Sequence, residues 1–135
     1  MEKVKVFLDT NVVLDYFTGR MGDGLAEKII QAGQDPLFEL CISFLTAVNI
    51  MYVAKKASPQ LKPEVLRSIF TILPQGATQW DDAASMGMDD FEDAIQASCA
   101  LRNGSFFVIS RDRHFGKSPL VCLSPDEFLA AITEN

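Results

Sequence analysis

The chain has 135 residues, of which 48% are hydrophobic, so it is expected to form one domain over residues 1–135 with its own core. No stretch reaches the roughly 18 unbroken apolar residues of a membrane span, and the first apolar run stops at Asp9, too early for a signal peptide. Twelve basic and eighteen acidic residues give a net charge of −6, which argues against a protein that binds nucleic acid through a broadly basic surface.

Short apolar strands alternate with helices along the chain. Strands are indicated by apolar, β-branched runs between turn residues, and helices by apolar spacing with capping residues at the ends. In chain order we predict a strand over 4–8, helices over 11–17 and 25–33, a strand over 37–43, helices over 44–56 and 63–70, a strand at 72–73, helices over 81–86 and 91–102, strands over 105–110 and 120–123, and a last helix from 124 onward. This alternation predicts an α/β fold with a central parallel sheet covered on both faces.

Two of the predicted helices carry further information. The helix over 44–56 is apolar nearly all round, which implies burial. The last helix has Ser124 as its N-cap, Pro125 in its first turn and Glu127 completing a capping box. No internal repeat or interdomain linker is visible.

Three aspartates are expected at one edge of the sheet. Asp9 follows the first strand, Asp112 follows the strand over 105–110, and Asp93 lies in the first turn of the helix before that strand. In open α/β sheets the strand ends converge on the edge where ligands bind. Carboxylates packed together need a cation, and Mg²⁺ or Mn²⁺ suits such oxygen ligands. A bound cation reverses the local field and can activate water against a phosphodiester.

Each of these acids also has a purely structural interpretation. Asp9 could cap the helix that follows it. The acidic run 89–93 could supply a capping box that starts at Asp89 or at Asp90, and it complements the helix dipole in either register. Asp112 could be a turn residue paired with its basic neighbours. The residues alone leave these alternatives open.

The three cysteines, Cys41, Cys99 and Cys122, are odd in number, widely spaced and set among apolar residues. This pattern favours reduced thiols over a disulfide framework or a zinc site. A cytoplasmic protein is therefore expected.

In order and spacing, several segments resemble the PIN domain, a family of small metal-dependent ribonucleases that includes toxins of bacterial toxin–antitoxin pairs. The segments that carry the resemblance are 7–15, 42–46, 90–95, 109–115 and 123–129. The resemblance implies a three-layer α/β/α fold with an acidic pocket at one edge of the sheet. The acids that it assigns to the metal are Asp9, Asp93 and Asp112, with Asp90 as an auxiliary acid on nearly the same helix face as Asp93. Asn11 and Ser110 match polar residues that support them.

One position departs from the family pattern. The helix after the second strand usually carries a glutamate six residues beyond the serine, and counted from Ser43 that position is Asn49. An amide can coordinate a metal or hold a water but brings no charge, so metal binding and water activation should be weaker. The alternative is a buried asparagine satisfied by backbone groups, since an unpartnered amide in the core is costly.

The first functional hypothesis is a Mg²⁺- or Mn²⁺-dependent endoribonuclease, the toxin component of a toxin–antitoxin pair. Its catalytic residues would be Asp9, Asn49, Asp93 and Asp112. The basic residues that would contact the RNA backbone, unless they form only a solvated turn, are Arg111, Arg113, His114 and Lys117.

The second hypothesis is a PIN-like module that binds RNA or protein with little catalysis, because Asn49 removes a charge. A third, weaker one is a hydrolase of small phosphate esters. The resemblance also implies a small antitoxin partner and a homodimer, for which the regions 44–56 and 62–72 could supply a surface. No membrane partner is expected.

Overall fold

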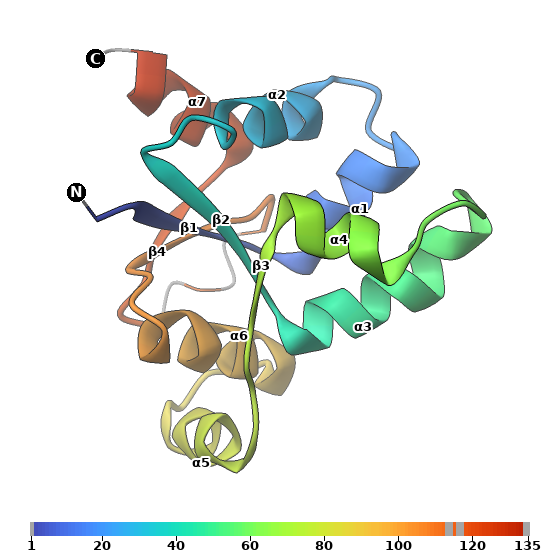
Figure 1. Ribbon diagram of the computed structural model, residues 1–135. Coiled ribbons are helices and arrows are strands. Elements are labelled where there is room, and N and C mark those ends of the chain that lie inside the picture. Colours follow the sequence, from blue (N-terminus) through green and yellow to red (C-terminus); the bar gives the residue numbers. More distant parts are fainter. Residues whose placement is uncertain (1, 113–114, 116–117, 134–135) are drawn as a thin grey trace.

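A five-stranded parallel sheet forms the centre of the computed structural model, which describes residues 2–112, 115 and 118–133 (Figure 1). The strands are β1 (Val4–Leu8), β2 (Phe38–Ser43), β3 (Thr71–Leu73), β4 (Phe107–Ile109) and β5 (Val121–Leu123). Their order is β3-β2-β1-β4-β5, and every neighbouring pair is parallel. The predicted parallel α/β sheet is therefore confirmed, with β1 at its centre.

Helices cover both faces of this sheet. They are α1 (Thr10–Thr18), α2 (Leu25–Ala32), α3 (Phe44–Val53) with the 3₁₀ turn η1 (Ala54–Lys56), α4 (Pro63–Ile69), α5 (Ala77–Ser85), α6 (Phe91–Arg102) and α7 (Pro125–Thr133). Along β1, Val6 and Leu8 join the core formed with α1, α2, α3 and α7, whereas Phe7 joins the core formed with α6. This alternation along a strand gives the three layers that Figure 1 shows.

Two predicted helices differ from those observed. Helix α5 begins at Ala77, not at residue 81, because the Gln79 side chain accepts a hydrogen bond of 2.7 Å from the backbone N–H of Gly76 and so caps an earlier start. The expected burial of the helix over 44–56 is wrong for one of its faces. Phe44, Val48 and Tyr52 lie four residues apart along α3 and are 51–75% exposed.

The capping box at the last helix is confirmed. The Ser124 hydroxyl accepts from the backbone N–H of Glu127 at 3.1 Å, and the Glu127 carboxylate accepts from the backbone N–H of Ser124 at 2.9 Å. All three cysteines are free thiols, as expected. Within the described part of the chain, no helix is both long enough and apolar enough to cross a membrane.

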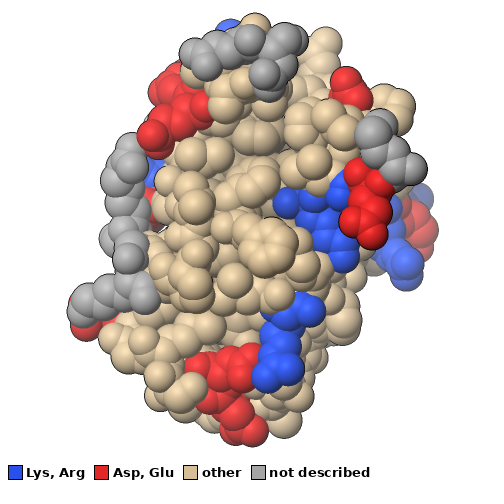
Figure 2. Space-filling view, turned by 90° about the vertical axis from the view of Figure 1, so that its left-hand side faces the viewer, with Lys and Arg blue, Asp and Glu red and all other residues tan. Residues whose placement is uncertain are grey.

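Charged side chains are sparse in the middle of the face shown in Figure 2. Lysines and arginines there lie beside aspartates and glutamates toward the margins. The described atoms of this face form no broad basic surface, in keeping with the net charge.

Candidate active site

Asp9 lies at the carboxyl end of the central strand and performs two tasks at once. One carboxylate oxygen accepts a hydrogen bond of 2.8 Å from the backbone N–H of Thr10, which makes Asp9 the N-cap of α1. The other oxygen accepts one of 2.8 Å from the hydroxyl of Ser110, just after β4. Asp9 is only 9% exposed. The capping interpretation is confirmed, and the same carboxylate also joins the ends of β1 and β4.

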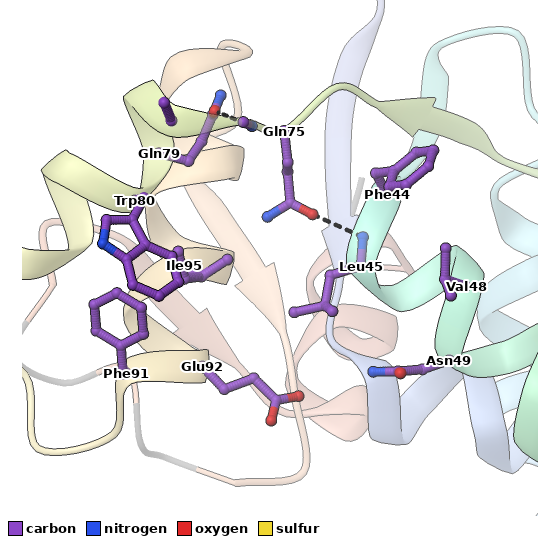
Figure 3. A pocket seen from close by; sticks show the side chains of 12 residues that line it. Phe44, Leu45, Val48, Asn49, Gln75, Gln79, Trp80, Phe91, Glu92 and Ile95 are labelled. Carbon is purple, nitrogen blue, oxygen red and sulfur yellow. Dashed lines mark hydrogen bonds between the residues drawn. The ribbon is translucent and has the colours of Figure 1, made fainter.

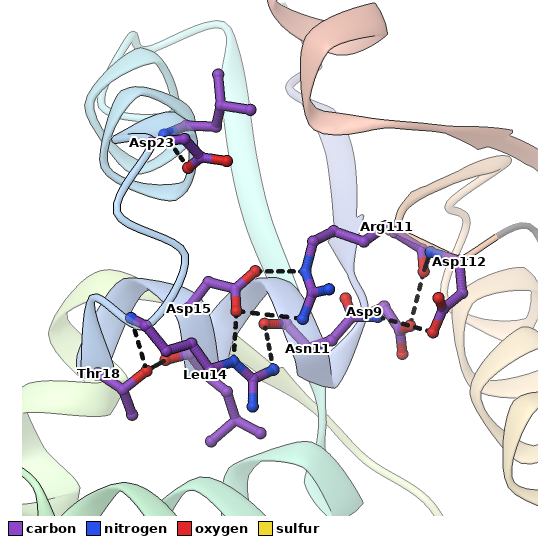
Figure 4. Close-up of polar contacts among 11 residues, drawn as sticks. Asp9, Asn11, Leu14, Asp15, Thr18, Asp23, Arg111 and Asp112 are labelled. Carbon is purple, nitrogen blue, oxygen red and sulfur yellow. Dashed lines mark hydrogen bonds and ion pairs between the residues drawn. The ribbon is translucent and has the colours of Figure 1, made fainter.

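Ser110 connects Asp9 to Asp112. Its hydroxyl donates to Asp9 and accepts from the backbone N–H of Asp112 at 3.1 Å. The Asp112 carboxylate accepts from the side-chain amide of Asn11 at 3.2 Å (Figure 4). The cause is the register of the sheet, because Leu8 pairs with Ile109 and the next residues of both strands then face each other. Asp9, Asn11, Ser110 and Asp112 thus form one hydrogen-bonded group, called the acidic edge below.

Ion pairs around a buried aspartate hold the acidic edge in place. Asp15 on α1 is 6% exposed and pairs with Arg111 at 2.6 Å and with Arg20 at 2.6 Å (Figure 4). Arg111 lies between Ser110 and Asp112, so this pair ties their loop to α1. Its guanidinium is therefore engaged within the protein. The RNA-contact predictions for Arg113, His114 and Lys117 lie outside the described residues.

The first turn of α6 approaches the same end of the sheet. Asp90 is its N-cap, because one carboxylate oxygen accepts a hydrogen bond of 3.1 Å from the backbone N–H of Asp93. The capping register that starts at Asp90 is thus confirmed. Asp93 is half-buried, and Gln96, three residues on and so on nearly the same face, donates a hydrogen bond of 3.2 Å to the Thr10 hydroxyl. The turn that carries Asp93 therefore lies beside the start of α1.

Asn49 lies in a groove of about 1010 Å³ between α3 and α5–α6. It is half-buried, and its side chain makes no hydrogen bond to any described residue, so the interpretation as a buried asparagine satisfied by backbone groups is wrong. Figure 3 shows Asn49 on one wall and Glu92 on the opposite wall, with Phe44, Trp80 and Phe91 along the groove. Glu92 is the acidic residue among those that line this groove.

From the sequence, Glu92 is predicted only as part of a capping run, and no individual role is predicted for Asp15, Arg20 or Gln96. The spacing of Glu92, one residue before Asp93, could have identified it. No local signal could have identified the cluster around Asp15, because Arg111 is 96 residues away in the chain.

The donor set at the acidic edge suits a hydrated divalent cation. Within the described residues, no three acidic, histidine or cysteine side chains lie close enough to form a complete metal cage, and Asp9, Asp93 and Asp112 are no exception. Mg²⁺, however, binds through one or two carboxylates and keeps several waters. The Oδ1 oxygen of Asn11, beside Asp112, is buried and accepts no hydrogen bond from any described group. This unpaired oxygen is a ligand type that a divalent cation or its water shell would accept.

Three comparisons with known proteins agree. The family model described as PIN domain matches residues 5–114. Ribonuclease VapC1 of Aquifex aeolicus is 28% identical over 142 residues, which cover 95% of both chains. A toxin–antitoxin complex from Klebsiella pneumoniae superposes with a TM-score of 0.69 at 23% identity, covering 89% of this chain and 97% of the other. VapBC2 from Rickettsia felis, solved bound to promoter DNA, gives a TM-score of 0.68 at 12% identity, covering 90% and 98%. The chain belongs to the PIN domain family.

Proposed function

We propose that this protein is a divalent-metal-dependent endoribonuclease of the toxin type, which hydrolyses RNA phosphodiester bonds. The observation that carries the proposal is the acidic edge, where the Ser110 hydroxyl hydrogen-bonds to Asp9 at 2.8 Å and to the backbone of Asp112 at 3.1 Å. Membership of the PIN family and the likeness to ribonuclease VapC1 support it.

The acidic edge gives each of its members a definite task. Asp9 and Asp112 would hold Mg²⁺ or Mn²⁺, with Asp93 and Asp90 on the facing turn of α6 as further acids. The bound ion would supply a more acidic water and charge stabilisation at the phosphate. Ser110 keeps the Oδ2 oxygen of Asp9 in one orientation. Asn11 does the same for Asp112, because its amide donates to that carboxylate.

Asn49 and Glu92 face each other across the groove and would position water or the RNA strand. The amide of Asn49 brings no charge, so a slow enzyme is expected. The second candidate, a PIN-like binding module with little catalysis, is favoured by this same residue.

The deciding experiment measures RNA cleavage with Mn²⁺ and, separately, Mn²⁺ binding by calorimetry. We expect D9N and D112N to lose both, and the exposed matched control D81N to lose neither. A protein that binds Mn²⁺ through Asp9 but leaves RNA uncut would be the binding module. Cleavage of a generic phosphate ester in preference to RNA would favour the small-ester hydrolase.

For partners we propose RNA as substrate, a small antitoxin, and a second copy of this chain. One solved structure of similar fold is a toxin–antitoxin complex. The exposed apolar row Phe44, Val48 and Tyr52 on α3 supports a protein contact there. A V48D variant that stays folded but becomes monomeric in ultracentrifugation would assign this row to the homodimer. A cytoplasmic location remains a prediction that the free thiols favour.

A further inference from the structure

A buried polar contact joins three helices behind the candidate site. The side-chain amide nitrogen of Gln96 on α6 donates to the hydroxyl of Thr46 on α3 at 2.7 Å and to the hydroxyl of Thr10 on α1 at 3.2 Å. The two hydroxyls also share a hydrogen bond of 2.7 Å. Gln96 is 1% exposed and Thr46 is fully buried. We call these three residues the Gln96 bridge.

Packing alone does not explain a glutamine at this position. Its buried neighbours on α6 are all small, and Ala94, Ala97 and Ala100 among them are apolar. An apolar side chain of similar volume would fill the same space without desolvating an amide. The Oε1 oxygen of Gln96 is buried and accepts no hydrogen bond from any described group, so the amide is only half satisfied. Burying this half-satisfied amide lowers the free energy of unfolding. Its two donated hydrogen bonds therefore indicate a role other than stability.

Each partner in the bridge is next to a residue of the candidate site. Thr10 follows Asp9 and donates its backbone N–H to the Asp9 carboxylate. Gln96 lies one helical turn after Asp93, and Thr46 lies one turn before Asn49, so each pair shares a helix face. The amide of Gln96, on the helix that carries Asp93, therefore contacts both the helix that Asp9 caps and the helix that carries Asn49.

We infer that Gln96 is a positioning residue that fixes the spacing between Asp9 and Asp93, and that the affinity for the divalent ion depends on it. This inference rests on the proposed function, because it assumes that both aspartates face the ion. Groups that orient metal ligands without touching the metal are typically worth 10–100-fold in affinity. Gln96 would act in this way through the Thr10 hydroxyl and the first turn of α6.

The test is Mn²⁺ binding by calorimetry on the full chain, with the melting temperature measured on the same samples. Q96M keeps the side-chain volume and removes both donated bonds. We expect its dissociation constant for Mn²⁺ to rise about tenfold while the fold is retained. T46V removes the hydroxyl that accepts from Gln96, so it should also raise the dissociation constant for Mn²⁺. T46S keeps a hydroxyl at this position and should bind Mn²⁺ as tightly as the wild type.

S98A is the matched control. Ser98 is 1% exposed on the same helix and donates to Asp82 on α5 at 2.9 Å, so its loss removes a buried hydrogen bond away from the bridge. S98A should lower the melting temperature and leave the Mn²⁺ affinity unchanged. If Q96M does not fold, T46V and T46S decide the question.

The outcomes separate the two proposals. If the wild-type chain binds Mn²⁺ and loses it in D9N, but Q96M and T46V bind as tightly as the wild type, this inference is overturned and the proposed function stands. An equal loss of affinity in S98A would also overturn it, since the effect would then be general destabilisation. If the wild-type chain binds no Mn²⁺, both proposals fail together.

Discussion

The two sides of the candidate site are built in opposite ways. At the acidic edge every described side chain of the group is hydrogen-bonded, and the ion pairs around Asp15 hold the loop at residues 110–112 against α1. In the groove between α3 and α5–α6, whose lining is largely apolar, Asn49 makes no hydrogen bond to a described residue. Preorganised ligands suit a cation that must be held in one geometry, whereas an open apolar wall suits a larger and more variable ligand. Under the proposed function, the acidic edge would bind the ion and the groove would meet the substrate.

The largest expected effect comes from removing the Asp15 carboxylate, whose ion pairs hold the loop of the acidic edge against α1. D15N leaves Arg20 and Arg111 without their charged acceptor, and hydrogen bonds to charged groups are worth about 1.5–3 kcal/mol. We expect a loss of free energy of unfolding in that range, measured by urea denaturation, together with weaker Mn²⁺ binding because the loop at Asp112 is released. D81N, at an exposed position of α5, is the control. Unchanged Mn²⁺ affinity in a destabilised D15N protein would show that the ion pairs of Asp15 contribute only to stability.

Within the acidic edge, S110A removes the hydroxyl that joins Asp9 to the backbone of Asp112. The affinity for Mn²⁺ should fall about 10–100-fold, as is usual when a group that orients a metal ligand is lost. S110T, which keeps the hydroxyl, should bind nearly as well as the wild type. Equal affinities for S110A and the wild-type protein would mean that Asp9 needs no such orientation.

On the groove side, N49E adds the missing charge. We expect about a tenfold faster RNA cleavage with Mn²⁺, equivalent to about 1.4 kcal/mol of transition-state stabilisation, and no gain for the neutral control N49Q. If Glu92 already supplies part of this charge, E92Q should slow the wild-type enzyme and have a smaller effect in the N49E background. A rate that N49E leaves unchanged would remove Asn49 from the catalytic residues.

The sequence sufficed for the parts of the molecule that depend on local pattern. Asp9 and Ser110 each directly follow a buried strand, and these strands were predictable from their apolar runs. The two strands pair in parallel, so Asp9 and Ser110 lie opposite each other. The family resemblance indicates the same two residues. The exposed row on α3 could not be predicted, since a helix that is apolar all round does not reveal which face the fold leaves uncovered. In the Gln96 bridge, Gln96 contacts Thr46, which is 50 positions away in the chain, and Thr10, which is 86 positions away. No local sequence pattern predicts contacts over such separations.

The smallest effect concerns the contact between α5 and α6, where Asp82 on α5 forms an ion pair with Arg102 on α6 at 2.6 Å. Hydrogen bonds from Arg102 and Ser98 lower the pKa of Asp82 from 3.8 to about 2. A carboxyl with a lowered pKa stabilises the folded state above its unfolded pKa, and this contribution is lost as the pH falls from about 3.8 to about 2. The side chain is 28% exposed, so solvent screens the pair and the effect is small.

The difference in melting temperature between wild type and D82N should therefore be constant at neutral pH and shrink toward zero as the pH falls from about 3.8 to about 2. A difference that persists at pH 2 would mean that Asp82 acts through packing and not through its charge.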